Sequence, residues 1–392
     1  MLNEFKKIEQ IDEIKQGRVF RKYIRGNNFP TLVITVCMHG NEPAALAAMK
    51  LLFSSDRIKE GDLRGNIYVL IGNVEALIRS QRFVHKDFNR VWSRENLELV
   101  RHAPIEEWPE IHELHELKSM DYQITSIVAE HGSQPLTFLD LHTTSADSAP
   151  FIPFNDAIMN RRLAENFPIP LILGIEEFLD GPLMSYVNDL GFPALGFEAG
   201  RHDDPFSADR HAAFVELFLN HLGMIGITEN QIQELQDTLT LGFKFSPGFY
   251  EIIYRHGVVP FSGFKMAPGF RNFQAIHRKQ VLASDQSGEI SAGQSGLIFM
   301  PLYQTEGDDG FFIIRPVSKF WLWISKQLRK FNLLKGIAYL PGVRVDTLNP
   351  RIYWANPKIT RFFPREIFHL LGFRVKRTSS DRLMLVFREY SP

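Results

Sequence analysis

The stretch "TLVITVCMHGNEPAALAAMKLLF", residues 31–53, joins an apolar run to a helical pattern across one tight corner. Its first eight residues are apolar and rich in β-branched side chains, which is typical of a strand buried in a sheet. Gly40 allows a sharp turn, and Pro43 suits the first turn of a helix. His39 and Glu42 stand on this corner. The stretch predicts a strand-to-helix unit whose connection presents two metal-binding side chains.

The same alternation of strand and helix continues over the first 235 residues. Helical patterns separate three further apolar runs, "GNIYVLIG" at 65–72, "LTFLDLH" at 136–142 and "PALGFEA" at 193–199. Such runs predict strands covered on both faces. Strands alternating with helices predict an α/β fold with a mainly parallel or mixed central sheet. We therefore expect an α/β/α domain over residues 1–235.

The remaining chain changes its pattern twice. Residues 236–316 are rich in Gly and Phe with closely spaced turn signals, and they predict a small all-β domain. Residues 317–392 open with the basic, aromatic helical pattern "SKFWLWISKQLRKFNLLKG" and end on an apparent hairpin around Ser379–Asp381. We therefore expect a β-rich lobe followed by a basic α+β extension.

Length and composition are those of an ordinary globular protein. The 392 residues are 44% hydrophobic and 23% charged, with a formal net charge of −1. Cys37 is the only cysteine, so no disulfide can form within the chain. The first 17 residues lack the apolar core of a secretion signal. These features predict a cytoplasmic protein with no nucleic-acid partner.

The balanced net charge conceals an uneven distribution. From Pro316 to Pro392, 15 Lys and Arg face 4 Asp and Glu, whereas the preceding residues carry 29 basic and 41 acidic groups. Three interpretations of this extension stay open. It could pack on the acidic body, either within the molecule or in a homo-oligomer. It could instead bind an anionic membrane surface through Trp321 and Trp323, or bind nucleic acid. Packing is favoured, because the extension also contains apolar strand-like segments that need a core.

Side chains with metal and acid–base chemistry stand at the ends of the predicted strands. His39 and Glu42 follow the first, Asp140 and His142 end the third, and Glu198 lies in the fourth. The carboxyl ends of parallel strands meet at one edge of a sheet, so these side chains are expected to meet there. Two histidines and one carboxylate are the ligand set of a catalytic zinc that keeps one position open. The sequence predicts one Zn²⁺ per chain.

Four motifs together resemble a known family. "HGNE", "DFNR", "LDLHTT" and "FEAGRHDDPF", in this order and spacing, resemble the succinylglutamate desuccinylase/aspartoacylase family of the zinc-carboxypeptidase-like superfamily. The similarity covers residues 25–315, because "GLIFMPLYQTEGDDGFFIIRP" resembles that family's β-rich C-terminal lobe. The resemblance implies zinc-dependent hydrolysis of the amide bond of an N-acyl amino acid, in a catalytic domain capped by the lobe. The basic extension is additional to it.

The resemblance also implies the roles of the metal ligands and the catalytic acid–base group. His39, Glu42 and His142 correspond to the zinc ligands. Glu198 corresponds to the carboxylate that activates a water molecule and then passes its proton to the leaving amine. A partly desolvated glutamate suits this role, because burial raises its pKa toward the useful range.

The segment after the second predicted strand supplies the remaining site residues by resemblance. Arg82 corresponds to the arginine that polarises the scissile carbonyl, and Asn89 and Arg90 to the pair that binds the substrate's carboxylate. A planar guanidinium can hold a carboxylate through two parallel hydrogen bonds. Asp87 and Asp140 are expected to orient the zinc histidines.

The chain departs from family members that act on N-acetylaspartate. Those members carry an arginine ten residues before the catalytic glutamate, where this chain has Asn188, and a tyrosine near Phe311 and Phe312. An acidic substrate group therefore loses two contacts. We expect a different N-acyl amino acid or a related small amide.

Alternatives from other classes stay open. A carboxypeptidase-like peptidase shares the zinc ligands and the carboxylate-binding pair, and a long open groove would favour it over the deacylase. A non-catalytic metal-binding module, recruited by the basic extension, gives no reason to keep Glu198. The segment "IHELHEL", residues 111–117, is interpreted as a solvated helix face and not as a second metal site.

Overall fold

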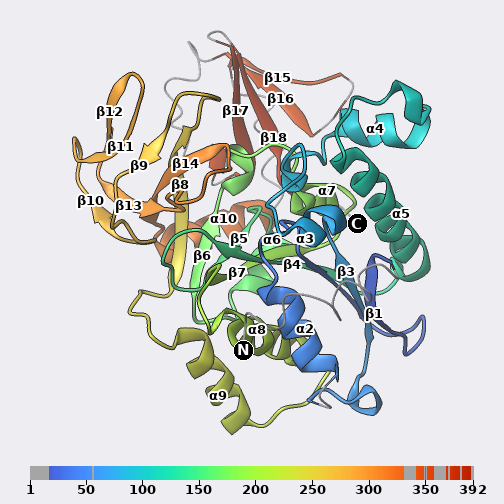
Figure 1. Ribbon diagram of the computed structural model, residues 1–392. Coiled ribbons are helices and arrows are strands. Elements are labelled where there is room, and N and C mark those ends of the chain that lie inside the picture. The colour runs from blue at the N-terminus through green and yellow to red at the C-terminus, as the bar shows by residue number, and fades with distance from the viewer. Residues whose placement is uncertain are drawn as a thin grey trace.

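The predicted metal ligands and Glu198 lie on or shortly after strands of a central five-stranded sheet (Figure 1). The structure is a computed structural model that describes residues 17–54, 57–330, 341–347, 349, 351–356, 368–369, 371–379 and 382–389. In spatial order the sheet contains β1 (Val19–Tyr23), β3 (Asn66–Ile71), β2 (Thr31–Val36), β4 (Leu136–Thr144) and β7 (Ala194–Arg201). The last four are parallel, and β1 pairs antiparallel at the edge. This confirms the predicted mixed sheet.

Helices cover both faces of this sheet, which explains why every residue of β2, β3 and β4 is buried. One apolar core joins the sheet to α2 (Ala44–Ser54), α6 (Ile158–Ala164), α8 (Ser207–His221) and α9 (Glu229–Thr240). A second core joins it to α4 (Arg94–His102), α5 (Glu113–His131) and α7 (Leu183–Asp189). Short helical turns complete the connections: α3 (Val74–Arg79), η1 (Glu60–Asp62), η2 (Phe88–Arg90), η3 (Ile105–Glu107) and η4 (Ile175–Glu177).

A second, six-stranded sheet forms most of the β-rich lobe. Its spatial order is β10 (Ala275–Ile276), β13 (Gly296–Phe299), β14 (Asp309–Pro316), β8 (Gly248–Gly257), β6 (Pro170–Leu173) and β5 (Ile152–Phe154). A small sheet of β12 (Gly288–Ser291), β11 (Val281–Asp285) and β9 (Lys265–Met266) lies beside it. The predicted all-β region is confirmed. Because β5 and β6 pair into this sheet, the lobe is continuous with the α/β region, and a domain boundary at 235 stays a prediction.

The basic extension has the predicted α+β character. It contains α10 (Lys319–Lys330) and an antiparallel sheet of β15 (Val343–Val345), β16 (Ile352–Ala355), β18 (Arg382–Phe387) and β17 (Phe373–Ser379). The hairpin is present, with Ser379 opposite Arg382, and the two residues of its turn lie outside the described part. Among the described helices, none is long and apolar enough to cross a membrane.

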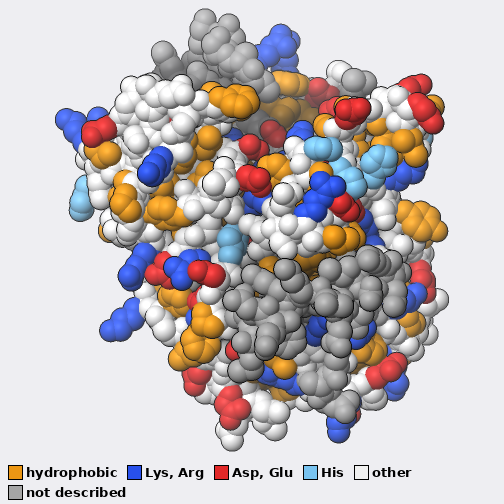
Figure 2. All heavy atoms as spheres, viewed as in Figure 1, with side chains coloured by type: hydrophobic (Ala, Val, Ile, Leu, Met, Phe, Trp, Pro, Cys, Tyr) orange, Lys and Arg blue, Asp and Glu red, His pale blue; other side chains and the backbone are white. Residues whose placement is uncertain are grey.

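The extension contacts the body through buried charges around Asp156. Arg329 of α10 and Arg388, just after β18, both bind its carboxylate, and Arg161 donates to it at 2.5 Å. These contacts support the packing interpretation within the molecule. Phe320, Trp321 and Trp323 of α10 remain exposed, so membrane binding stays a prediction. On the face shown in Figure 2, acidic and basic side chains are interspersed.

Candidate metal and catalytic site

The corner after β2 places two side chains at the sheet edge. The chain turns at Cys37, which has a left-handed φ of 55°. Gly40 lies in the predicted turn, which the amide of Glu42 closes by donating to the carbonyl of His39 at 3.1 Å. Gly40 also has a second role, because a Cβ atom there would lie 2.1 Å from the backbone carbonyl carbon of Ala76. Only glycine permits this close approach, which brings the corner against α3. α2 then begins directly after Pro43, whose carbonyl accepts from the amide of Ala47 at 3.1 Å.

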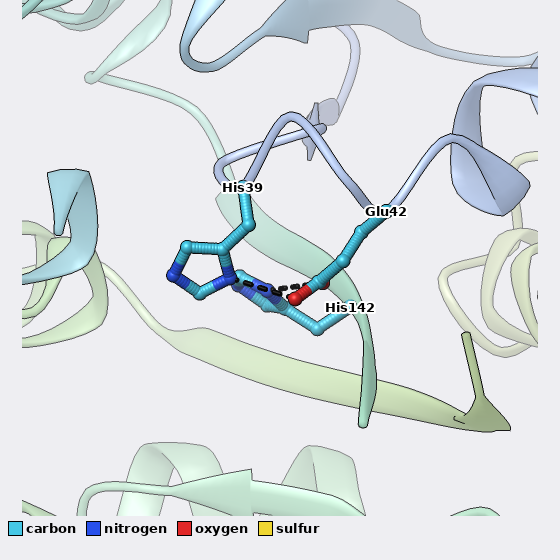
Figure 3. A group of neighbouring side chains, drawn as sticks. All are labelled: His39, Glu42 and His142. Atoms are coloured by element: carbon cyan, nitrogen blue, oxygen red, sulfur yellow. Dashed lines mark hydrogen bonds and ion pairs between the residues drawn. The ribbon is translucent and has the colours of Figure 1, made fainter. Parts of the chain in front are cut away.

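His39, Glu42 and His142 meet in one buried cluster (Figure 3). The Nδ1 atom of His39 lies 2.8 Å from Oε1 of Glu42, and the Nδ1 atom of His142 lies 3.1 Å from Oε2. One ligand atom from each residue lies within 4.8 Å of the others. Two imidazole nitrogens and a carboxylate are donors that suit a divalent transition metal, so the residues fit the implied zinc.

Two further acids hold the outer nitrogens of the imidazoles. The Nε2 atom of His39 lies 3.0 Å from Oδ1 of Asp87, and that of His142 lies 2.9 Å from Oδ2 of Asp140. Nε2–H donating to a carboxylate leaves the Nδ1 lone pair directed toward Glu42. Asp87 and Asp140 therefore contact the two histidines that they are expected to orient.

Charge pairing sets the protonation of this cluster. Burial opposes ionisation of Glu42 and Asp87, but their charged neighbours together outweigh it and hold both pKa values well below their usual range. These neighbours are His39 and His142 for Glu42, and His39, Arg82 and Arg90 for Asp87. Burial likewise opposes a charged His142, yet Asp140 and Glu42 raise its pKa well above its ordinary value. These carboxylates therefore surround a position where positive charge is favoured. A divalent ion can supply that charge in place of protons.

Arg82 is fixed beside the cluster. Its Nη2 atom donates to Oδ2 of Asp87 at 2.8 Å, and Nη1 lies 3.6 Å from Oε1 of Glu42. Burial opposes its charge, but Asp87, Glu42 and the more distant Glu198 raise its pKa further. A permanently charged guanidinium thus lies next to the candidate metal position.

Glu198 approaches from the adjacent strand. In the β4–β7 pairing it stands opposite His142, and its side chain lines the same pocket. Its Oε2 atom is buried and has no hydrogen-bond partner among the described residues. Burial raises the pKa of Glu198 to about 8, the nearby Glu42 acting in the same direction. A buried carboxylate with a free oxygen and a raised pKa is suited to carry a proton.

Asn89 and Arg90 lie on η2 and are both engaged by the protein. Asn89 accepts from the amide of Leu183 at 2.8 Å through Oδ1, and its Nδ2 lies 3.5 Å from Nε2 of His142. Arg90 donates through Nη2 to Oδ2 of Asp309 at 2.8 Å. The expected carboxylate-binding pair is therefore near the cluster, but a carboxylate of the chain itself already occupies the guanidinium.

The pocket is closed on one side by the β-rich lobe. The lobe supplies Met300, Leu302, Gln304, Gly307, Asp308, Asp309 and Phe312. The α/β region supplies His39, Glu42, Arg82, Asp87, Arg90, Thr143, Thr144, Ser145, Glu198 and His202. A short pocket enclosed in this way is the feature that favours a deacylase over a peptidase.

Of the positions at which this chain differs from family members that act on N-acetylaspartate, only some lie at this pocket. Asn188 is fully buried on α7, where it bonds Asn160 and the carbonyl of Phe192, and it does not line the pocket. Phe312 does line it, whereas Phe311 packs its ring on His256. Only the aromatic departure therefore borders the candidate substrate position.

Sequence reasoning missed a supporting role for α5. The "IHELHEL" segment is not a solvated face throughout, because Glu113 and Glu116 are buried. Glu113 accepts from the backbone amides of Val84 and Lys86 at 2.7 and 3.1 Å, which fixes the segment between Arg82 and Asp87. The helical spacing of the charged residues could not indicate these hydrogen bonds, because the bonded amides lie about 30 residues away in the sequence.

Comparisons with known proteins agree with this geometry. The family model described as "Succinylglutamate desuccinylase/Aspartoacylase catalytic domain" matches residues 28–225. A search of curated proteins found no match. Among solved structures, the chain is similar to a succinylglutamate desuccinylase from Vibrio parahaemolyticus, at 15% identity over 75% of this chain and 84% of the other, with a TM-score of 0.56.

Two other solved structures give similar values. A succinylglutamate desuccinylase/aspartoacylase from Rhodobacter sphaeroides is 16% identical over 75% of this chain and 88% of its own, with a TM-score of 0.54. The product-bound ectoine utilization protein EutE (DoeB) from Ruegeria pomeroyi is 14% identical over 74% and 87%, with a TM-score of 0.51. At these identities the likeness shows a shared fold.

Proposed function

Because the chain belongs to the succinylglutamate desuccinylase/aspartoacylase family, which comprises hydrolases of amide bonds, we propose that it is a zinc-dependent deacylase. Its substrate is an N-acyl amino acid or a related small amide. The observation that carries the proposal is the free, buried Oε2 atom of Glu198 beside a complete set of His39, Glu42 and His142.

His39, Glu42 and His142 are the residues that would hold the ion, with Asp87 and Asp140 orienting the two imidazoles. A bound Zn²⁺ supplies a Lewis acid that acidifies water and polarises an acyl carbonyl. Three protein ligands leave a position open for these groups.

The chain's own residues perform the proton transfers. Glu198 takes a proton from the attacking water at its free Oε2 atom and later donates that proton to the departing amine nitrogen. A pKa raised by burial suits both steps, since the group must accept and release a proton near neutral pH.

Arg82 is placed to stabilise the negative charge that develops on the acyl oxygen. Its side chain is only 13% exposed and its orientation is fixed by the bond to Asp87, so little reorganisation is needed during the reaction. Asn89 and Arg90 are the groups proposed to contact the amine portion of the substrate.

A peptidase and a metal-binding module are the alternatives. The lobe residues that close the pocket leave little room for an extended peptide, which favours the deacylase over a peptidase. A binding module gives no reason for a glutamate beside the ligands whose buried Oε2 atom has no hydrogen-bond partner in the described part of the chain.

Release of the free amine from N-acyl amino acids tests this proposal. The panel varies the acyl group (acetyl, formyl, succinyl, longer) and the side chain (acidic, neutral, basic). We expect metal-loaded protein to hydrolyse one substrate class, chelation to abolish turnover and added Zn²⁺ to restore it. Inactivity of metal-loaded protein across the panel and on small amides would contradict the proposal.

A further inference from the structure

The Arg90 guanidinium faces a carboxylate of the lobe. Asp309, the first residue of β14, accepts from Nη2 of Arg90 at 2.8 Å through Oδ2. Its other oxygen, Oδ1, accepts from Nε of Arg255 on β8 at 2.5 Å. One carboxylate therefore bridges two guanidinium groups, and each side chain of the Arg90–Asp309 pair is less than a fifth exposed.

This arrangement changes what the pocket offers to a substrate. Arg90 and Asp309 both line the pocket that contains the metal ligands. The guanidinium assigned by resemblance to a substrate carboxylate is thus already paired with an acid of the chain, which it shares with Arg255. A substrate carboxylate at Arg90 would have to displace Asp309, which then stands as a like charge beside it.

The other polar groups next to Arg90 in the pocket add no unpaired positive charge for a substrate carboxylate. Arg82 is paired with Asp87, and Asn89, which the amide of Leu183 holds through Oδ1, offers only its uncharged Nδ2 donor. Asp308, next to Asp309, adds a second acid to the pocket lining. The wall that faces the amine portion therefore disfavours an additional negative charge.

We propose that Asp309 is a specificity-determining residue that selects amides whose amine portion carries no free carboxylate. The inference rests on the deacylase function proposed above and narrows its substrate class to N-acyl amino acid amides and N-acyl amines. Asp309 takes the place of the substrate carboxylate, and the Arg90–Asp309 pair offers both a donor and an acceptor to a neutral or cationic group.

Matched substrates test the proposal on the unmodified protein. The kcat/KM of the metal-loaded enzyme is measured for N-acetyl amino acids and for their primary amides with the same side chains, following the free amine by chromatography. We expect the amides to be preferred at least tenfold. Preference for the free acids would overturn this inference while leaving the deacylase proposal intact, whereas no hydrolysis of either series would overturn both.

Substitution of Asp309 then assigns the preference to this residue. Asp309→Asn keeps the shape and removes the competing charge, so the ratio of kcat/KM for acid over amide is expected to rise at least tenfold. Glu306→Gln is the matched control, because it removes the same charge from an exposed position in the loop just before β14, outside the pocket lining. An unchanged ratio in folded Asp309→Asn, or an equal rise in the control, would overturn the assignment. If Asp309→Asn does not fold, the substrate ratio of the unmodified enzyme decides.

Discussion

The two histidines of the cluster use their nitrogens in the same way. Each directs Nδ1 toward Glu42 and Nε2 toward an acid, Asp87 for one and Asp140 for the other. Because the acids fix the ring orientations, the ligand atoms are brought together before any ion binds. The free energy of metal binding is therefore not spent on ordering the ligands.

Removal of one imidazole should empty the site of metal. His142→Ala leaves two ligands, too few for tight zinc binding, so the bound metal is expected to fall from one ion per chain to near zero after dialysis. Elemental analysis measures this directly. His277→Ala, at an exposed position in the lobe, is the control and should keep its metal. Full retention by His142→Ala would remove this histidine from the ligand set.

At the scale of elements, strand ends were the predictable part of the site. The apolar runs 31–38 and 136–142 correspond to β2 and β4, which begin at the expected residues and differ by two residues at their ends. Burial on both faces makes such runs continuous and easy to recognise. Since parallel strands end at one edge, His39, Glu42 and His142 could be brought together from the sequence.

Contacts between distant segments could not be predicted in this way. Asp309 meets Arg90 across 219 residues, and Glu113 binds backbone amides almost 30 residues away. Such pairs leave no periodicity in the sequence, because the lobe and the helix reach the site only through tertiary packing. The turn predicted at Gly40 is present, but the left-handed φ of Cys37 and the packing of Gly40 on Ala76 could not be predicted.

The packing of the corner on α3 yields a stability prediction. Gly40→Ala places a methyl group 2.1 Å from the backbone of Ala76, where no side chain can move aside. The overlap is expected to cost about 3 kcal/mol or more of unfolding free energy and to displace His39. Gly61→Ala, whose Cβ meets nothing within 4 Å, is the control. Denaturant unfolding measures both, and equal stability of the two variants would contradict the packing argument.

For the whole molecule, the uneven charge of the sequence has a structural counterpart. Asp156 of the body binds Arg329 and Arg388 of the extension and Arg161 of α6, all buried. When a buried acid that binds three guanidinium groups loses its charge, the folded structure around it is strongly destabilised. The position of the extension therefore depends on the ionisation of Asp156.

Acidification should release the extension. Burial opposes ionisation of Asp156, but Arg161, Arg329 and Arg388 hold its pKa well below the usual value. Its stabilising contribution is therefore complete above the ordinary aspartate pKa of about 4 and is lost as the pH falls below it. Hydrogen exchange of α10 should rise in this range, after correction for intrinsic rates.

The same exchange measurement on a variant provides the control. Asp156→Asn should show fast exchange in α10 already at pH 7, with a loss of roughly 3 kcal/mol of local stability, and little further change on acidification. Equal pH dependence in the variant and the unmodified protein would show that other groups hold the extension.

Glu198→Gln tests the central claim most directly, with bound metal and amine release measured on the same sample. The substitution keeps the shape of the side chain but removes its capacity to carry a proton, and Glu198 is not among the three ligands. We predict one bound metal ion per chain, as in the unmodified protein, with hydrolysis reduced at least a thousandfold, an effect on the order of that expected for a general acid–base group. Turnover close to that of the unmodified protein, with the metal in place, would contradict the account.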